Sequence, residues 1–356
     1  MITILATVTV LGVLIFFHEL GHFLLAKILG VRVEAFSLGF PPKLFSKKIG
    51  DTDYRLSVIP LGGYVKMLGE NPKDEVPPEL LPLSFLHRPL WQRFLIVAAG
   101  PAFNLLFAIL AFWIVFSLTG LPYLTTEISG VKEGSPAARA GLLKGDRITS
   151  VNGHPVNRWE ELTFRVREGG RKPLTIWVKR GEKTFEAIVA PEMMETTDIF
   201  GATVSAPLIG VVAPDNFATE PVGVFRAMQE AAGASYRLSV LTLQSLYKLV
   251  TREMPLKNLG GPVLIAQVAG KQAEMGLTNL VHFMAVLSVN LAMLNLLPVP
   301  ILDGGHLFFF LLEAVRRKPV KLKHREMAQA VGLMMLLALM LLVFYQDLLR
   351  LLGHNQ

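Results

Sequence analysis

Long apolar segments alternate with polar loops along the chain. Four segments are largely apolar over a length that suits a membrane-spanning helix, namely 1–30, 94–119, 277–306 and 328–346. About 20 apolar residues allow a helix to cross the hydrocarbon core of a bilayer. The first segment has no basic stretch before it and continues into polar side chains, so we expect an uncleaved span. The pattern predicts a polytopic α-helical membrane protein with four transmembrane helices.

Residues 31–93, between the first two spans, follow a different pattern. Apolar and polar residues alternate over 32–38 and 54–59, as they do in strands. A turn and another short strand follow in 60–67. We therefore expect a small β-sheet or hairpin. Its exposed edge is a candidate site for binding an extended peptide, although a hairpin without a binding role fits the same pattern. The candidate substrate-binding residues on this edge are Gly62, Gly63, Tyr64 and Val65.

Residues 125–192 have the composition of a compact soluble α+β module. Ser135 followed by Pro136 is typical of a helix start, and Asn152-Gly153 is a strong signal for a tight hairpin. A second short helix is expected over 162–166. Paired strands are expected over 174–178 and 184–189. The module is thus predicted to be a domain inserted between the second and third spans.

Residues 193–257 are too few for a second module of this kind. Apolar residues recur with mixed helical periodicity from 220 to 254. We expect a linker followed by amphipathic helices that lie on the membrane face, because the chain then returns towards the membrane through 256–262. A packed surface helix is the alternative.

The distribution of charged residues predicts on which side of the membrane each loop lies. Only 18% of the residues are charged, the mean hydropathy is +0.46 and the formal net charge is +7. Basic residues next to spans favour the cytoplasm, which places both termini and the 125–192 module outside. The positive charge therefore indicates membrane topology in a lipid bilayer and gives no reason to expect a nucleic-acid partner. The basic residues concentrate in 316–325 and at Arg32, Lys43, Lys47, Lys48, Arg55, Lys66, Lys73, Arg88 and Arg93.

The candidate chemistry lies in the first span. His18 and His22 are four residues apart, so a helix places them one turn apart on one face. This spacing suits two imidazoles that bind one Zn²⁺, with Glu19 as the general base. The chain has no cysteine, so the ligands must be His, Asp or Glu. Ionisable groups inside an apolar span usually mark a functional site, although two core histidines would also fit.

A catalytic zinc usually has three protein ligands. Asp303 is our preferred third ligand, because Pro298 and Pro300 prevent a regular helix just before it. His306, His282 and Glu313 are alternatives. In the second span, Gly100-Pro101 is expected to break the helix near its start, and a simple proline kink between packed helices is the alternative. Asn104 follows as a candidate residue near the metal or the substrate.

The inserted module resembles a PDZ domain of the circularly permuted kind found in bacterial proteases. The resemblance lies in Gly134-Ser135-Pro136-Ala137, Gly145-Asp146-Arg147-Ile148 and Val151-Asn152-Gly153. One such domain is found here. A Gly-Leu-Gly-Phe carboxylate-binding loop is not evident.

The motifs taken jointly resemble the site-2 protease family, and within it the bacterial regulator-of-sigma-E protease type. These motifs are His18-Glu19-Leu20-Gly21-His22, the segment from Asn295 through Leu302-Asp303-Gly304, and the PDZ-like insert. The resemblance implies that His18, His22 and Asp303 bind zinc, that Glu19 is the catalytic base and that Asn295 assists the substrate or the oxyanion. Many members of this type have two PDZ domains, whereas this chain has one.

The family resemblance implies proteolysis within the bilayer of a bacterial cytoplasmic (inner) membrane. Expected substrates are single-pass transmembrane proteins, such as anti-sigma factors or remnant signal peptides. An upstream site-1 protease would cut these substrates first. Two other classes compete on the sequence alone, namely a non-catalytic membrane adaptor with a structural metal and a zinc transporter. Glu19 argues against the adaptor, and the lack of ionisable residues in the second and fourth spans argues against the transporter.

Overall fold

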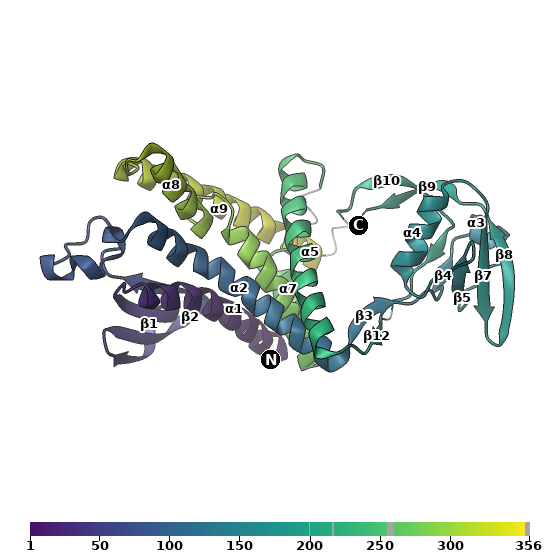
Figure 1. The fold of residues 1–356 in the computed structure, drawn as a ribbon, viewed down its shortest axis with the longest axis horizontal. Helices are drawn as coiled ribbons and strands as arrows, with labels where there is room; N and C mark the ends of the chain where they lie inside the picture. Colours follow the sequence, from purple (N-terminus) through teal and green to yellow (C-terminus); the bar gives the residue numbers. More distant parts are fainter. Residues whose placement is uncertain (199, 216, 255–259, 353–356) are drawn as a thin grey trace. The chain divides into compact units, whose positions relative to one another are not determined.

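The computed structural model describes residues 1–198, 200–215, 217–254 and 260–352, which form two compact units (Figure 1). The helical unit comprises Met1–Val115, Met228–Tyr247 and Leu259–Gln356. The sheet-rich unit comprises Phe116–Ala227 and Lys248–Asn258.

The helical unit contains the predicted apolar helices. Four helices among the described residues are long and apolar enough to cross a membrane: α1 (Ile2–Ile28), α2 (Leu90–Thr119), α7 (Leu277–Asn295) and α9 (Leu322–Leu351). The prediction of four apolar helices is therefore confirmed. Shorter elements accompany them, namely η1 (Pro78–Leu83), η2 (Phe85–His87), α6 (Pro262–Glu274) and α8 (Asp303–Arg316), together with the long helix α5 (Val224–Val250).

The third apolar segment does not continue as one helix to residue 306. Helix α7 ends at Asn295, and α8 begins at Asp303. Pro298 and Pro300 lie in the irregular stretch between them. Because proline lacks the backbone N–H that a helix interior needs, the chain bends here. The bend makes Asp303 the first residue of a new helix.

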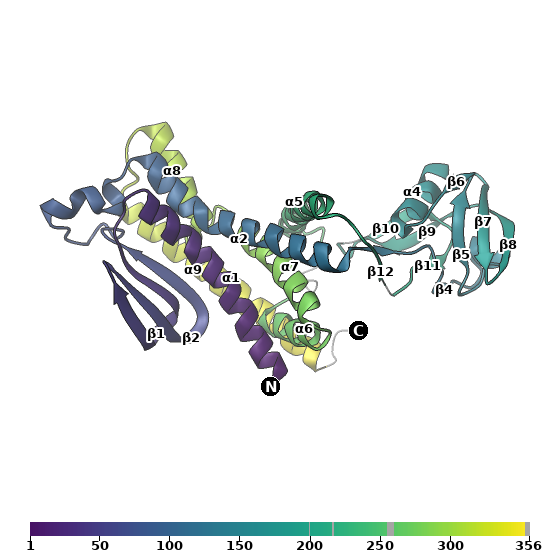
Figure 2. The same cartoon turned by 60° about the horizontal axis from the view of Figure 1, so that its bottom comes forward.

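Helix α2, by contrast, continues without a break through Gly100 and Pro101, contrary to the sequence prediction. Proline removes only one helical hydrogen bond, and close packing against α1 offsets that loss. A Cβ atom added to Gly21 of α1 would lie 2.3 Å from the carbonyl oxygen of Ala99. The two helices run side by side in both views (Figures 1 and 2). Glycine at position 21 therefore permits this close approach.

The predicted strands of the 31–93 loop form two long strands, β1 (Val33–Ile49) and β2 (Thr52–Met67), beside α1 (Figure 2). Each strand pairs with two different parts of the other. Phe36 pairs with both Tyr54 and Val65, and Tyr54 also pairs with Lys47. Residues 33–38 thus lie between 52–57 and 63–67. Residues 63–67 form an edge, which has no second strand partner among the described residues.

Two apolar clusters hold α1 at its two ends. Ala6, Val10 and Leu14 pack with residues of α6 and α7. Ala26 near the other end packs in a cluster that joins the β1–β2 sheet to α2 and α8. The middle of α1, which carries the His18 and His22 pair, is thus fixed from both sides.

The sheet-rich unit follows the module predicted over 125–192 and extends beyond it. Its central sheet has the antiparallel order β6-β5-β7-β8. Its elements up to residue 189 are β3 (Leu121–Leu124), β4 (Gly130–Val131), α3 (Pro136–Arg139), β5 (Arg147–Val151), β6 (His154–Pro155), α4 (Trp159–Gly169), β7 (Leu174–Arg180) and β8 (Lys183–Val189).

The local signals of this module have the expected structures. The Ser135 hydroxyl caps α3 by accepting a hydrogen bond from the backbone N–H of Ala138. Asn152 and Gly153 both have positive φ angles, 50° and 78°, in the tight turn between β5 and β6. Positive φ at both turn residues suits the twist of an antiparallel hairpin.

The segment after residue 192 differs from the expected linker and amphipathic helices. It forms β9 (Glu192–Thr197), β10 (Thr203–Leu208), β11 (Val211–Val212) and β12 (Phe217–Glu220). Strand β11 pairs with β4, and Ile209 is buried in the core of the module, so this segment completes the module. A single helix, α5, occupies most of 220–254 where a helix pair was expected. Residues 255–259 lie outside the described residues.

An ion pair between buried Asp146 and partly exposed Arg180 stabilises the sheet-rich unit. Asp146 is fully buried, and its two oxygens accept hydrogen bonds of 2.7 and 2.8 Å from the guanidinium of Arg180. The backbone N–H of Leu143 also donates to Asp146, at 2.8 Å. Burial alone would raise the pKa of Asp146. The hydrogen bonds from Arg180 and Leu143 more than offset it, so the pKa lies below its ordinary value.

We expect Asp146→Ala to lower the free energy of unfolding of this unit by about 1–3 kcal/mol, because the Leu143 N–H loses its acceptor. Hydrogen exchange of β5 and β7 amides in the full chain measures the loss. Glu168→Ala is the control, because its pair with Arg165 lies at the surface and contributes little.

The pH dependence follows from the lowered pKa of Asp146. The stabilisation should be fully present above the unfolded-state pKa of about 3.9 and should be lost as the pH falls through the lower folded-state pKa. Equal protection of the two variants and the native chain at neutral pH would contradict this role.

Candidate metal centre

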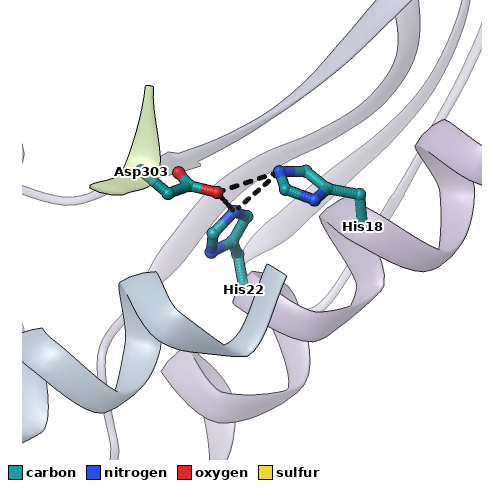
Figure 3. Close-up of side chains that lie close together, drawn as sticks. All are labelled: His18, His22 and Asp303. Atoms are coloured by element: carbon teal, nitrogen blue, oxygen red, sulfur yellow. Dashed lines mark hydrogen bonds and ion pairs between the residues drawn. The ribbon is translucent and has the colours of Figure 1, made fainter. Parts of the chain in front are cut away.

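Three potential metal ligands converge in the helical unit (Figure 3). His18 and His22 come from successive turns of α1, and Asp303 comes from the first residue of α8. Oδ2 of Asp303 lies 3.1 Å from Nε2 of His18 and 3.5 Å from Nε2 of His22. The two Nε2 atoms are 3.3 Å apart. The three ligand atoms thus form a nearly equilateral triangle.

This triangle fits a zinc ion. Zn²⁺ bonds to His and Asp ligands are about 2.0–2.1 Å long, and tetrahedral geometry then separates two ligands by about 3.3 Å. Oδ2 of Asp303 is also buried without a hydrogen bond of acceptable geometry from any described residue. An unsatisfied buried carboxylate oxygen is costly unless a cation binds it. The donor set and its spacing therefore suit Zn²⁺.

Helix α2 orients His22 through its backbone. Nδ1 of the buried His22 lies 2.9 Å from the carbonyl oxygen of Ile96, to which it can only donate. A hydrogen on Nδ1 leaves the lone pair of Nε2 directed at the other two ligands. No local pattern in the sequence indicates this contact, because it depends on the packing of α2 against α1.

Asn104 of α2 holds the other imidazole. Its side-chain amide lies 3.1 Å from Nδ1 of His18, and its Oδ1 is buried without a hydrogen-bond donor among the described residues. Rotating the amide by 180° would allow Oδ1 to accept a hydrogen from Nδ1 and would leave Nε2 free to bind metal. The backbone of Asn104 is itself fixed, because its carbonyl accepts a 2.8 Å hydrogen bond from Ser288 of α7. The structure thus places Asn104 against a predicted ligand.

Gly100 provides the space for both rings. A Cβ atom at this position would lie 2.3 Å from Nε2 of His22 and 2.8 Å from Cε1 of His18. Sequence reasoning treated Gly100 only as part of a helix break. One turn separates Gly100 from Asn104 on α2, and this spacing was the available sign that both face the site.

The ligands line a cavity of 240 Å³ that also contains the predicted general base. Glu19 follows His18 on α1 and faces this cavity. The sheet edge forms part of its wall, and Arg325 of α9 forms another part. The remaining lining residues are Gly63, Tyr64, Val65, Met67, Glu70, Phe85, Val97 and His306.

Glycine also brings the sheet edge close to Glu19. A Cβ atom on Gly63 would lie 2.9 Å from Cγ of Glu19 and 2.8 Å from Cγ2 of Ile15. A Cβ atom on Gly62 would lie 2.3 Å from the Phe40 ring. The strand segment that begins at Gly63 therefore lies close to Glu19 and lines the cavity.

Other predicted or alternative residues are not part of the three-ligand group. Asn295 ends α7 and is not among the described residues that line the cavity. His282 packs against the Phe112 ring, and Glu313 accepts a 2.7 Å hydrogen bond from Arg93. His306 lines the cavity but is not part of the three-ligand group.

Comparisons with known proteins identify the family of the chain. The model of peptidase family M50 matches residues 6–339. A Campylobacter jejuni protein named as a zinc metalloprotease is 38% identical, over 99% of this chain and 95% of its own length. Protease RseP of Yersinia pestis is 32% identical, over 97% of this chain and 98% of its own.

A solved PDZ domain of an SdrC-like protein from Listeria monocytogenes is 26% identical to part of the chain. The match covers 27% of this chain and 93% of the Listeria domain, with a TM-score of 0.21.

The family match extends over nearly the whole length and includes the segments that carry His18, His22 and Asp303. The chain therefore belongs to peptidase family M50 and is an intramembrane zinc metalloprotease.

Proposed function

We propose that His18, His22 and Asp303 bind the catalytic zinc and that Glu19 is the general base for cleavage of a membrane-spanning substrate. The observation that carries this assignment is the convergence of three ligand atoms within 3.1–3.5 Å of one another, in a cavity that Glu19 also lines. Contacts from α2 orient both imidazoles for this role.

The chemistry then divides between the metal and the chain. When bound, Zn²⁺ supplies Lewis-acid chemistry that polarises a carbonyl group and acidifies water. Glu19 accepts a proton from the attacking water while the water oxygen bonds to the peptide carbonyl carbon. Glu19 then donates a proton to the leaving nitrogen when the C–N bond breaks. We further propose that Asn295 assists the substrate or the oxyanion, as the family resemblance implies.

The sheet edge is our proposed substrate-binding site. A helical substrate hides its peptide bonds within its own hydrogen bonds, so it must unwind locally before it is cut. An unwound segment can pair its backbone with the free side of residues 63–67, which line the cavity. The edge would thus hold an extended chain beside Glu19.

We propose the membrane topology that the basic loops predict. Both termini and the PDZ-like module would lie outside the cytoplasmic membrane, with 31–93 inside. We also propose that a site-1 protease trims the single-pass substrates first, and that the module hinders access of substrates with bulky outer domains. Anti-sigma factors and remnant signal peptides are the substrate classes to test.

We expect the native chain to bind about one zinc ion, and Asp303→Asn to lower its zinc affinity by at least tenfold, because one ligand is lost. Metal analysis of purified protein after dialysis against a weak chelator measures this. His306→Gln is the matched control and should keep its zinc. Equal zinc loss in the two variants would require His306 in the ligand set.

Glu19→Gln should keep the zinc and the fold but lower kcat by at least 100-fold, because an amide cannot accept the proton of water. Cleavage of a purified single-pass substrate in detergent or proteoliposomes measures kcat, and metal analysis of the same sample reports zinc. Turnover near the native rate in a zinc-loaded variant would assign the base to another residue.

Gly100→Ala should reduce zinc content and activity together, because the added methyl group enters the space of both imidazole rings. The control is Gly12→Ala, since a Cβ atom added to Gly12 on apolar α1 would meet no heavy atom within 4 Å. If both variants retained native zinc affinity, α2 would not restrict the ligand rings as described.

A further inference from the structure

Arg325 is half-buried, and its guanidinium has no hydrogen-bonding partner among the described residues. It lies in the first turn of α9, and its guanidinium stacks 6.0 Å from the centre of the Phe309 ring. No hydrogen bond or ion pair joins its guanidinium to another described residue. An arginine carries five N–H donors and is costly to bury unpaired. The side chain is therefore available to a ligand.

The position of Arg325 links it to the catalytic cavity. It lines the 240 Å³ cavity that contains Glu19 and the three metal ligands. It also lines an adjoining polar cavity of 490 Å³, which shares Met67, Glu70 and His306 with the first. Arg325 thus lines both the cavity that contains the metal ligands and the cavity next to it.

Three carboxylates that line cavities together with Arg325 have other partners. Glu313 pairs with Arg93 at 2.7 Å, and Glu326 pairs with Lys73 at 2.7 Å. Glu70 lines both cavities, but its carboxylate accepts a hydrogen bond from the backbone N–H of Met67 and forms no ion pair with Arg325. Neither these three side chains nor Asp74, which lines the larger cavity, forms an ion pair with the Arg325 guanidinium.

Hydrolysis itself produces an anion in this cavity. The water oxygen bonds to the carbonyl carbon, and the peptide C–N bond then breaks. One water proton goes to the leaving nitrogen, and the other is released as the new carboxylic acid ionises. Arginine binds carboxylates through two parallel N–H···O hydrogen bonds. The new C-terminus therefore matches the unpaired guanidinium in charge and in geometry.

We propose that Arg325 is a carboxylate-binding residue for the proteolytic reaction, and that its main ligand is the new C-terminal carboxylate of the product. The proposal rests on the proposed function of the His18, His22 and Asp303 site. An acidic side chain of the uncut substrate offers the same chemistry and is the second possible source. Either ligand would be bound by the guanidinium inside the cavity that Glu19 lines.

The test compares two synthetic transmembrane peptides that match the N-terminal product of a model single-pass substrate, whose cleavage site is first determined by mass spectrometry. One peptide ends in a free carboxylate and the other in an amide. Binding is measured by fluorescence anisotropy on zinc-loaded Glu19→Gln protein, which does not turn over. A failure of catalysis and a failure of carboxylate binding are thereby distinguished.

Arg325→Gln should weaken binding of the carboxylate peptide by about 10- to 100-fold and leave the amide peptide unchanged, because only the charged hydrogen bonds are lost. Arg325→Lys should recover part of the affinity, since it keeps the charge but loses the planar fork. Lys323→Gln, at an exposed position of the same helical turn, is the control and should change neither peptide.

The second source is tested with uncut substrates whose acidic residues near the cleavage site are replaced by amides. If Arg325→Gln weakens only the acidic substrates, Arg325 binds carboxylates but takes them from substrate side chains. Equal effects on the carboxylate and amide peptides, or no effect on either, would overturn the proposal. So would the same loss in Glu70→Gln, because Arg325 would then act on Glu70. Zinc content in each variant reports whether the cavity is intact.

Discussion

Burial of two imidazoles and one carboxylate among apolar helices is the constraint on which the helical unit depends. Such groups are costly in an apolar environment unless every polar atom has a partner. Helix α1 supplies the two imidazoles, and α8 supplies the carboxylate. Helix α2 supplies the Ile96 carbonyl and the Asn104 amide that hold the ring nitrogens facing away from the metal site. The positions of three helices are therefore tied to one small group of atoms.

Glycine makes this arrangement sterically possible. Gly21 lets α1 meet the backbone of α2, Gly100 leaves room for the imidazole rings, and Gly63 brings the sheet edge to Glu19. Each glycine within a helix or strand costs about 0.5–1 kcal/mol relative to alanine. Close packing around the metal ligands offsets that cost here. A site assembled in this way tolerates little added volume, because protein interiors are already close-packed.

The sheet-rich unit has a core of its own, and the residues proposed for chemistry all lie in the helical unit. The alignment with the Yersinia protease spans 447 positions, more than the 356 residues of this chain, so that relative carries segments without a counterpart here. Arg325 adds a third element, a cation beside the metal ligands that can bind the carboxylate formed by cleavage.

Local signals in the sequence were enough to predict several features. The long apolar segments predict helices, the i, i+4 spacing pairs His18 with His22, and Asn152-Gly153 predicts a tight turn, because each depends only on neighbouring residues. The sequence left four candidates for the third ligand, predicted a break in α2 and ended the inserted module at 192.

Only the tertiary structure brought Asp303 to the imidazoles, kept α2 continuous and closed the module with β11. It also showed that Gly100 leaves room for the imidazole rings and that Asn104, already a candidate from the sequence, contacts His18. These features depend on contacts between residues distant in the chain, and packing decides such contacts, whereas local pattern does not.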